Sequence, residues 1–341
     1  MGENGAVSDH DFTWHDGERT IVFREGALAG AAELLADGVW ERFELVTTPR
    51  ALGGAPLALA ERASAVHEVP RGPVADAAAT IIDSVNNPTL VALGGGRVID
   101  TAKAIAAVRG GRVCALPTTL SGAEMTAIHR LPAGHEHEAR HLVRPGLVIA
   151  DPLELTTLDD KPLRASAMNS LGHGAEALYA PLANPVATLE ALRGAQRIAA
   201  ALDRPAGEDR AGLALGSLLC AAALDSAGYA VHHVVCQTLV RVLETPHAET
   251  NAILLPLTME AMRPRAPEAI DSLAAALGVD GAGIRERIEV LGGGPRKLSD
   301  LGADRGRLRR ALDAILSRPE LRYTPDPPGR QELDELLQAA W

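Results

Sequence analysis

The feature that most constrains the fold is an alternation of short apolar runs with helical patterns, which begins near residue 19 and stops near residue 152. Between the apolar runs, the segments LAGAAELLADGVWERF and VADAAATIIDSVNN carry apolar residues at helical spacing. Strands that alternate with helices form a parallel sheet covered by helices, which is an architecture typical of nucleotide-binding domains. The runs expected to be strands are 19–26, 43–48, 89–96, 112–119 and 146–152.

The remainder of the chain lacks this alternation. Ala- and Leu-rich segments follow one another there, broken by Pro and Gly, which is typical of an all-helical domain. A chain of 341 residues is long enough for two domains. The sequence therefore predicts an α/β Rossmann-like parallel-sheet domain at 1–152 and an all-α helical domain at 153–341. The expected helices are 163–180, 186–202, 211–242, 265–277, 305–317 and 331–340.

Charge and hydropathy restrict the partners. The net charge of -11 argues against nucleic acid or an anionic membrane as a partner, and it favours a small-molecule substrate. The most apolar segment, 211–231, is interrupted by Ser217, Asp225 and Ser226, so we expect a buried core helix and no membrane span. Residues 1–14 lack a basic stretch followed by an apolar run, so a cytoplasmic location is expected.

A strand-to-helix turn in TLVALGGGRVIDTAKAIA is the first candidate binding site. Gly94, Gly95 and Gly96 would let backbone N–H groups approach a pyrophosphate, and a helix N-terminus adds partial positive charge. Asp100 follows in the first turns of the expected helix. The motif differs from GxGxxG, and three glycines alone also suit a bare tight turn.

The next expected strand ends in small hydroxyl residues, in CALPTTLSGAEMTAIHR. Thr118, Thr119 and Ser121 can hydrogen-bond the phosphate, ribose or carboxamide of a cofactor. The alternative is a Ser/Thr-rich turn that caps a helix starting near Glu124. Two such loops after successive strands together favour a ligand site.

Histidines in the helical part form the second candidate site. Asn169 and His173 stand at i and i+4, so they share one helix face, and His233 and Gln237 have the same spacing. His247 follows one loop later. A single His on an apolar helix is most often a satisfied core residue. Three of them in otherwise apolar segments favour a shared site for a metal ion or for acid–base chemistry.

Five motifs, taken in order, resemble the iron-containing alcohol dehydrogenase superfamily and most of all its maleylacetate reductase branch. They are GGGRVIDTAKAIA, PTTLSGAEMT, DPLELTTL, NSLGHGAEALY and HHVVCQTLVRVLETPHAETNAILLP. The resemblance implies a dehydroquinate synthase-like fold, with an N-terminal Rossmann-like domain and a helical domain. It also implies a nicotinamide cofactor, NADH or NADPH, and a small-molecule substrate in the cleft between the domains, and a homodimer.

Carried over residue by residue, the resemblance places residues 94–96 at the pyrophosphate and residues 118, 119 and 121 around the rest of the cofactor. In metal-using members the first metal ligand is Asp, whereas this chain has an amide, which binds iron or zinc more weakly. Maleylacetate reductase-like members also tend to have Asn there, and the resemblance implies that they work without metal. The prediction is a degenerate, metal-free site, with iron or zinc as the alternative because three imidazoles alone can hold zinc. The degenerate site consists of Asn169, His173, His233 and His247.

Two departures from the branch bear on the reaction. Gln237 stands where the branch has another His, and Gln cannot exchange a proton near neutral pH. Ala123 stands where Ser is usual beside the cofactor. The second expected strand ends without the Asp or Glu that would bind an adenosine ribose, and Arg50 could accept a 2'-phosphate, so both NADH and NADPH are compatible.

The leading hypothesis is an NAD(P)H-dependent reductase of an oxo or enone carboxylate, metal-independent, with His173 or His233 as proton donor. Arg130 and Arg241 are candidates to pair with a substrate carboxylate. The alternative is a diverged non-redox enzyme on the same fold, a cyclase, lyase or dehydratase in a specialised biosynthetic pathway. A non-catalytic binding protein is disfavoured, because the three histidines would then have no purpose.

Overall fold

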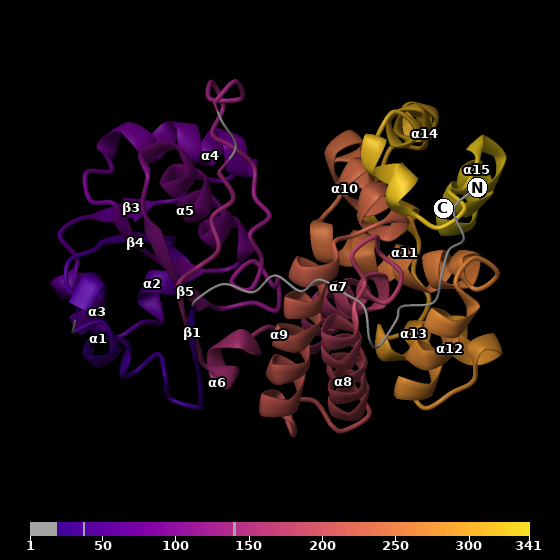
Figure 1. Ribbon diagram of the computed structural model, residues 1–341, viewed down its shortest axis with the longest axis horizontal. Helices are drawn as coiled ribbons and strands as arrows, with labels where there is room; N and C mark the ends of the chain where they lie inside the picture. Colours follow the sequence, from indigo (N-terminus) through magenta and orange to yellow (C-terminus); the bar gives the residue numbers. More distant parts are fainter. Residues whose placement is uncertain (1–18, 37, 139–140) are drawn as a thin grey trace. The chain divides into compact units, whose positions relative to one another are not determined.

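The computed structural model describes residues 19–36, 38–138 and 141–341, which form two compact units (Figure 1). The α/β unit reaches Leu158, and the helical unit runs from Asp159 to Trp341. Each unit is of the predicted class, a parallel sheet with helices in one and helices alone in the other, which confirms the predicted fold class. The N-terminal stretch on which the expected absence of a signal peptide rests lies outside the described residues.

The α/β unit contains a six-stranded, fully parallel sheet with the order β1-β6-β5-β4-β2-β3. Each of the five expected strands is present, although shorter than expected. The sequence reading missed β3, which has three residues of which only the central one is buried. The strands are β1 (Thr20–Phe23), β2 (Glu44–Thr47), β3 (Val66–Glu68), β4 (Thr89–Gly94), β5 (Arg112–Pro117) and β6 (Leu147–Ala150).

Alternation along the strands supplies the two faces of the sheet. In β4, Leu90 and Ala92 join one buried cluster, while Val91 and Leu93 join another, because successive side chains point to opposite faces. Helices α4 and α5 contribute to the first cluster, and α1 and α3 to the second. The helices of this unit are α1 (Ala31–Leu34), α2 (Pro49–Gly53), α3 (Leu57–Arg62), α4 (Val74–Ile81), α5 (Gly96–Arg109) and α6 (Pro152–Leu155), with short 3-10 turns at η1 (Gly38–Trp40) and η2 (Ile82–Ser84).

The topology defines where a ligand can bind. The chain runs from β2 outward to β3 and then returns to place β4 on the other side of β2. In an open parallel sheet, ligands bind beyond the carboxyl ends of the strands at such a reversal. Gly94, the last residue of β4, lies at that end, so the sheet places the glycine loop at the expected binding position.

The helical unit is built around α7 (Asp160–Ala177), which is buried continuously from Ala165 to Ala177. Helices α8, α9 and α11 pack against it. The remaining elements are α8 (Pro185–Leu202), α9 (Arg210–Ala227), α10 (Val231–Leu243), α11 (His247–Met262), α12 (Pro267–Ala276), α13 (Ile284–Leu291), α14 (Leu308–Leu316) and α15 (Arg330–Ala340), with 3-10 turns η3 (Gly281–Gly283), η4 (Leu298–Leu301), η5 (Arg305–Arg307) and η6 (Pro319–Tyr323).

The expected single helix over 211–242 is wrong. Gly228 has φ +87, a left-handed conformation that ends α9, and α10 begins three residues later. The break creates a new helix N-terminus beside His232 and His233, in the middle of the expected helix. The sequence reading also missed α11 and α13.

Helix α9 is long and apolar enough to cross a membrane by length and composition. Its apolar stretch is 61% buried inside the helical unit, where α9 packs against α7 and α8. These contacts are those of a core helix, as expected from its interrupting polar residues.

Candidate active site

The glycine loop presents an uncapped helix N-terminus. Gly95 is the N-cap of α5 and Gly96 its first residue, and no side chain caps this end. The first N–H groups of a helix have no partner within the helix, so an anion can accept hydrogen bonds from them. The α/β unit therefore contains a site that fits the pyrophosphate of a nicotinamide cofactor.

The hydroxyl loop that follows β5 lies directly against the glycine loop. The backbone N–H of Thr118 donates to the carbonyl of Gly94 (3.1 Å). A Cβ atom added to Gly96 would lie 2.8 Å from Oγ of Ser121, and one added to Gly95 would lie 3.1 Å from Thr119. The glycines are therefore needed for the approach of the two loops to each other, in addition to any approach of a cofactor. The structure brings together the residues that the sequence reading assigned to this site.

A buried lysine fixes the position of the hydroxyl loop. Nζ of Lys103, on α5, donates to the carbonyl oxygens of Ala123 and Thr126, both at 2.9 Å. The same ammonium forms an ion pair with Asp100 at 2.7 Å. Asp100, predicted to bind the cofactor, is thus engaged in supporting the loop. Sequence reasoning missed the role of Lys103, although its i+3 spacing from Asp100 was visible.

Glu124 lies in the same loop and is buried. Burial raises its pKa to about 7, against the opposing effects of a backbone hydrogen bond and of the nearby Lys103 charge. Its Oε2 atom has no hydrogen-bond partner among the described residues. A carboxyl group in this state is divided between its neutral and ionised forms near pH 7.

In the helical unit, α7 and α10 bring three histidine rings together. The rings of His173 and His233 are stacked, with centroids 4.9 Å apart, and the ring of His232 packs edge-on against His233 at 5.1 Å. A Cβ atom at Gly172 would lie 2.8 Å from Nε2 of His232, so the glycine before His173 allows this close packing. All three histidines are buried.

Glu176 holds this cluster in place, and the sequence reading missed it. Its carboxylate accepts the backbone N–H of His232 (2.6 Å) and of His233 (3.3 Å) in the first turn of α10. Nδ1 of His233 donates to the same carboxylate at 2.5 Å. A carboxylate is stabilised at a helix N-terminus by the unpaired N–H groups there. The spacing from His173 to Glu176, one helical turn, was the available signal.

The hydrogen bond to Glu176 leaves one nitrogen of His233 available. Nε2 of His233 is buried and has no hydrogen-bond partner in the part of the chain that the structure describes. Buried polar atoms are nearly always partnered, so this atom is a candidate to contact a ligand. Nδ1 of His173 is buried and unpartnered in the same way.

Burial keeps the neighbouring histidines neutral. Desolvation, followed by the proximity of the other histidines, lowers the pKa of His173 and of His232 well below the ordinary value. Glu176 gives His233 a carboxylate partner, and neither of the other two rings has a hydrogen bond to a carboxylate among the described residues. His233 is thus the ring of the three that has a carboxylate partner among the described residues.

Asn169 and His247 form a separate contact. Nε2 of His247 donates to the amide oxygen of Asn169 (3.1 Å). Asn169 is buried, whereas His247 is exposed in the helical unit. The amide that replaces the family's Asp is thus engaged with another residue of the predicted degenerate site.

This donor set fits a divalent metal ion poorly. Nε2 of His247 is hydrogen-bonded to the amide oxygen of Asn169, so a metal ion would have to replace this bond before either atom could act as a ligand. The stacked rings of His173 and His233 lie 21° from parallel, so the planes of their lone pairs meet far from both rings, whereas ligands of one ion must converge. Across residues 19–36, 38–138 and 141–341, no three His, Cys, Asp or Glu side chains are grouped to hold a metal ion.

Gln237, one turn after His233 on α10, faces an arginine. Nη2 of Arg318 donates to Oε1 of Gln237 (3.3 Å) and to the hydroxyl of Tyr229 (3.4 Å). The Tyr229 ring lies 6.1 Å from the ring of His233. Sequence reasoning missed Arg318, which lies far along the chain.

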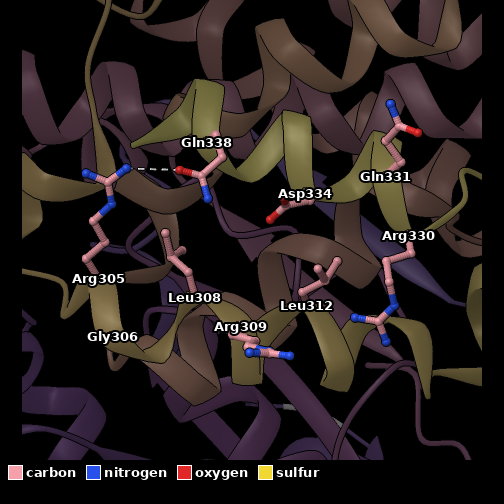
Figure 2. A pocket seen from close by; sticks show the side chains of 9 residues that line it. All are labelled: Arg305, Gly306, Leu308, Arg309, Leu312, Arg330, Gln331, Asp334 and Gln338. Carbon is pink, nitrogen blue, oxygen red and sulfur yellow. Dashed lines mark hydrogen bonds between the residues drawn. The ribbon is translucent and has the colours of Figure 1, made fainter.

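The two arginines proposed from the sequence as carboxylate partners, Arg130 and Arg241, are both exposed. Figure 2 shows a groove of about 640 Å³ in the helical unit, to which η5, α14 and α15 contribute. This groove contains no residue of the histidine cluster. Its lining consists of Arg305, Gly306, Leu308, Arg309, Leu312, Arg330, Gln331, Asp334 and Gln338.

Known families match both units. Residues 18–152 match the family described as iron-containing alcohol dehydrogenase. Residues 164–341 match the C-terminal region of the Fe-containing alcohol dehydrogenase family. The two matches follow each other without overlap and leave only a short segment between them.

Individual relatives point to one branch. The chain is 38% identical over 266 residues to maleylacetate reductase 1 of Rhodococcus opacus, covering 74% of this chain and 72% of that protein. It is 30% identical to maleylacetate reductase of a Rhizobium species, covering 97% of each. The crystal structure of maleylacetate reductase from Agrobacterium tumefaciens is similar with a TM-score of 0.85 and 31% identity, covering 97% of this chain and 98% of that one.

The glycine loop beside a hydroxyl loop, the histidine cluster and these matches agree with one another. The chain belongs to the iron-containing alcohol dehydrogenase family, in its maleylacetate reductase branch, and is an NAD(P)-dependent oxidoreductase.

Proposed function

We propose that the protein reduces an oxo or enone carboxylate such as maleylacetate with NADH or NADPH, without a bound metal ion, and with a histidine as proton donor. The α/β unit would hold the cofactor, which supplies a hydride for an electron-poor carbon of the substrate. The helical unit would hold the substrate. The observation that carries this proposal is the unpartnered Nε2 of His233, whose other ring nitrogen donates to Glu176.

His233 is the proton donor that the contacts favour. Reduction of a carbonyl or of a conjugated double bond leaves negative charge on the substrate oxygen, which must be neutralised by a proton. Glu176 keeps Nδ1 of His233 engaged, so a second proton, on Nε2, would be the one delivered. In this proposal the Glu176 carboxylate would also stabilise the positive charge of an imidazolium at His233. His173 has no such partner, so we assign it to packing and to shaping the site.

Metal independence is proposed from the contact between Asn169 and His247. In a metal site both side chains would direct their donor atoms at the ion. Here they are hydrogen-bonded to each other, and the neutral amide of Asn169 attracts a divalent cation less than a carboxylate at that position would.

The deciding experiment is turnover after removal of metals. The purified protein is dialysed against a chelator, its iron and zinc content is measured, and oxidation of NADH and NADPH by maleylacetate is followed. We expect turnover in the metal-depleted protein, with no increase when iron or zinc is added. Turnover that rises in proportion to bound metal would show that the proposed metal independence is wrong.

The cofactor site is tested through the glycine loop. Gly96→Ala places a methyl group against Ser121, whereas Gly53→Ala, in α2, places one in open space. We expect the dissociation constant of NADH to rise about tenfold in Gly96→Ala, an effect of roughly 1.4 kcal/mol, and to stay unchanged in Gly53→Ala. Equal affinities in the two variants would remove the glycine loop from the cofactor site.

A non-redox reaction is the second candidate, and Gln237 and Ala123 are the residues that favour it. In that case the cofactor would bind and remain unchanged over a full turnover. Tight NADH binding without net oxidation by any oxo or enone carboxylate would support this candidate. The hydrogen bond between Gln237 and Arg318 gives Gln237 a role that needs no proton exchange, which weakens this alternative.

A homodimer is proposed from family membership. Sedimentation equilibrium of the purified protein should then give twice the chain mass of 35.6 kDa. A monomer over the whole concentration range would contradict it.

A further inference from the structure

Arg318 carries a charge beside the histidine cluster that the proposed reaction has not yet used. It is the residue before η6, and its side chain is only 10% exposed. Two of its contacts, Gln237 and Tyr229, lie within one turn of His233 on either side along the chain. The guanidinium is therefore held near the proposed proton donor.

The hydrogen bonds of Arg318 do not use all the donors of its guanidinium group. Nε donates to Glu320 at 2.9 Å, which is a normal charge-assisted bond. Nη2 makes only the longer contacts to Gln237 (3.3 Å) and Tyr229 (3.4 Å), and both acceptors are neutral. Nη1 makes no hydrogen bond to the described residues. Nη1 can thus donate to a carboxylate, and one of the two long contacts of Nη2 can be exchanged for the second bond of the bidentate arrangement that suits arginine.

Arg318 carries a permanent positive charge, because a guanidinium stays protonated over the whole ordinary pH range. Glu320 is kept ionised by Arg318, which lowers the pKa of that carboxyl group to about 2. Glu320 occupies Nε and leaves the opposite end of the guanidinium open.

A purely structural ion pair is the competing explanation. Arg318 and Glu320 are two residues apart in one segment, so their bond cannot by itself fasten η6 to α10. The bonds that join this segment to Gln237 on α10 and to Tyr229, two residues before α10, are all long: Arg318 to Gln237 (3.3 Å), Arg318 to Tyr229 (3.4 Å) and Tyr229 to Glu320 (3.5 Å). An arginine that only joins two segments would be expected to make shorter hydrogen bonds and to use all its donors.

We propose that Arg318 binds a carboxylate group of the substrate and sets the preference of the enzyme for acidic substrates. Gln237 and Tyr229 are positioning residues that hold Nη2 in place. This rests on the proposed function, because reduction of an oxo or enone carboxylate is what requires such a partner. It also accounts for Gln237, since an amide oxygen accepts from a guanidinium at any pH, whereas a protonated histidine would repel it.

The test compares Arg318→Met and Arg318→Lys with the wild type in steady-state reduction of maleylacetate by NADH. The matched control is Arg285→Met. It removes a surface arginine of the same unit that is also paired with glutamate, in its case with Glu260 and Glu289. We expect the KM for maleylacetate to rise about 10- to 100-fold in Arg318→Met, with a smaller change in kcat and none in the KM for NADH. The KM of Arg318→Lys for maleylacetate should lie between those of the wild type and Arg318→Met. Lysine keeps the positive charge but cannot make the two parallel hydrogen bonds of a guanidinium.

A binding measurement separates this proposal from the proposed function. Maleate, a simple dicarboxylate, is titrated into the wild type and the variants by calorimetry. If the wild type shows no turnover but binds maleate, and Arg318→Met does not, the reductase assignment fails and the carboxylate site stands. Unchanged KM and unchanged maleate affinity in Arg318→Met would overturn the role of Arg318. Should Arg318→Met fail to fold, the same two measurements on Arg318→Lys decide.

Discussion

Each unit of the protein contains a buried histidine paired with a buried glutamate. In the α/β unit, Nε2 of His67 is hydrogen-bonded to Glu44 at 2.8 Å, and in the helical unit Nδ1 of His233 donates to Glu176 at 2.5 Å. Both carboxylates also accept backbone N–H groups, those of residues 86 and 87 for Glu44 and of residues 232 and 233 for Glu176.

The two pairs differ in the second ring nitrogen. Nδ1 of His67 is hydrogen-bonded to the hydroxyl of Ser84 (3.2 Å), so both nitrogens of this ring are partnered. Nε2 of His233 is buried and has no partner among the described residues. A fully satisfied pair stabilises the fold, while an unsatisfied nitrogen costs stability unless a ligand completes it. The two pairs share burial and a carboxylate partner, so what distinguishes His233 from His67 is the combination of that partner with a second nitrogen that no described residue contacts.

The largest expected effect comes from replacing the two histidines. His233→Gln should lower kcat roughly 100-fold or more, because a general acid contributes about 10²- to 10⁴-fold. His67→Gln should leave kcat unchanged and lower the melting temperature. Steady-state assays and thermal unfolding of both variants measure this. Similar losses of kcat in both variants would show that the two histidines do not differ in function as proposed.

Replacing Glu176 and Glu44 tests the same difference between the two histidine–glutamate pairs. In Glu176→Gln an amide NH2 would face groups that donate hydrogen bonds, so the orientation of His233 is lost and a donor is left unpaired. We expect kcat to fall about 10- to 100-fold, equivalent to roughly 1.4 to 3 kcal/mol. Glu44→Gln should cost a similar free energy of unfolding while kcat stays at the wild-type value. A Glu176→Gln variant that unfolds more readily but turns over normally would make both pairs structural.

The affinity for zinc tests whether the histidine site of the helical unit has lost its metal. Asn169→Asp restores a carboxylate beside His247, so the affinity for zinc should rise about tenfold or more, or roughly 1.4 kcal/mol. Competition with a chromophoric chelator measures the change. His67→Gln serves as the control, since removing the satisfied ring should not alter zinc affinity. Wild-type protein that already binds zinc as tightly as Asn169→Asp would contradict the proposed loss of the metal.

The smallest expected effect concerns Glu124, a buried glutamate with no histidine partner among the described residues. Its pKa is raised to about 7 by burial, so the folded protein keeps the neutral acid to a higher pH than the unfolded chain, in which the group ionises near pH 4.5. Its stabilising contribution is complete below that value and is lost as the pH rises through about 7. Glu124→Gln should therefore melt a few degrees higher than the wild type at pH 8, with the difference shrinking at pH 5.

Thermal unfolding of the wild type and Glu124→Gln between pH 5 and pH 9 checks this. A difference that stays constant over this range would show that Glu124 does not titrate there. A difference that grows toward low pH would reverse the sign and contradict the burial argument.

The close approach of the glycine loop to the hydroxyl loop follows from their positions after neighbouring strands, while their binding of the cofactor stays a prediction. Gly94, Gly95 and Gly96 are required by the local backbone and by the approach of Ser121, and both requirements follow from neighbouring strands of one sheet. In the helical unit the histidines themselves were identified, but Glu176 and Arg318 were not. The helix break at Gly228 was also missed, and with it the helix end that Glu176 binds.

The sequence by itself determined the order of the elements, the parallel sheet, the helical second unit and the identity of the family, because periodicity, glycine positions and ordered motifs are local properties. Only the tertiary structure decided which side chains meet. Arg318 and Gln237 are 81 positions apart, and Glu176 and His233 are 57 apart, so their contacts depend on how the helices pack. That packing gives His233 one partnered nitrogen and one unpartnered nitrogen, a difference that no local pattern in the chain encodes.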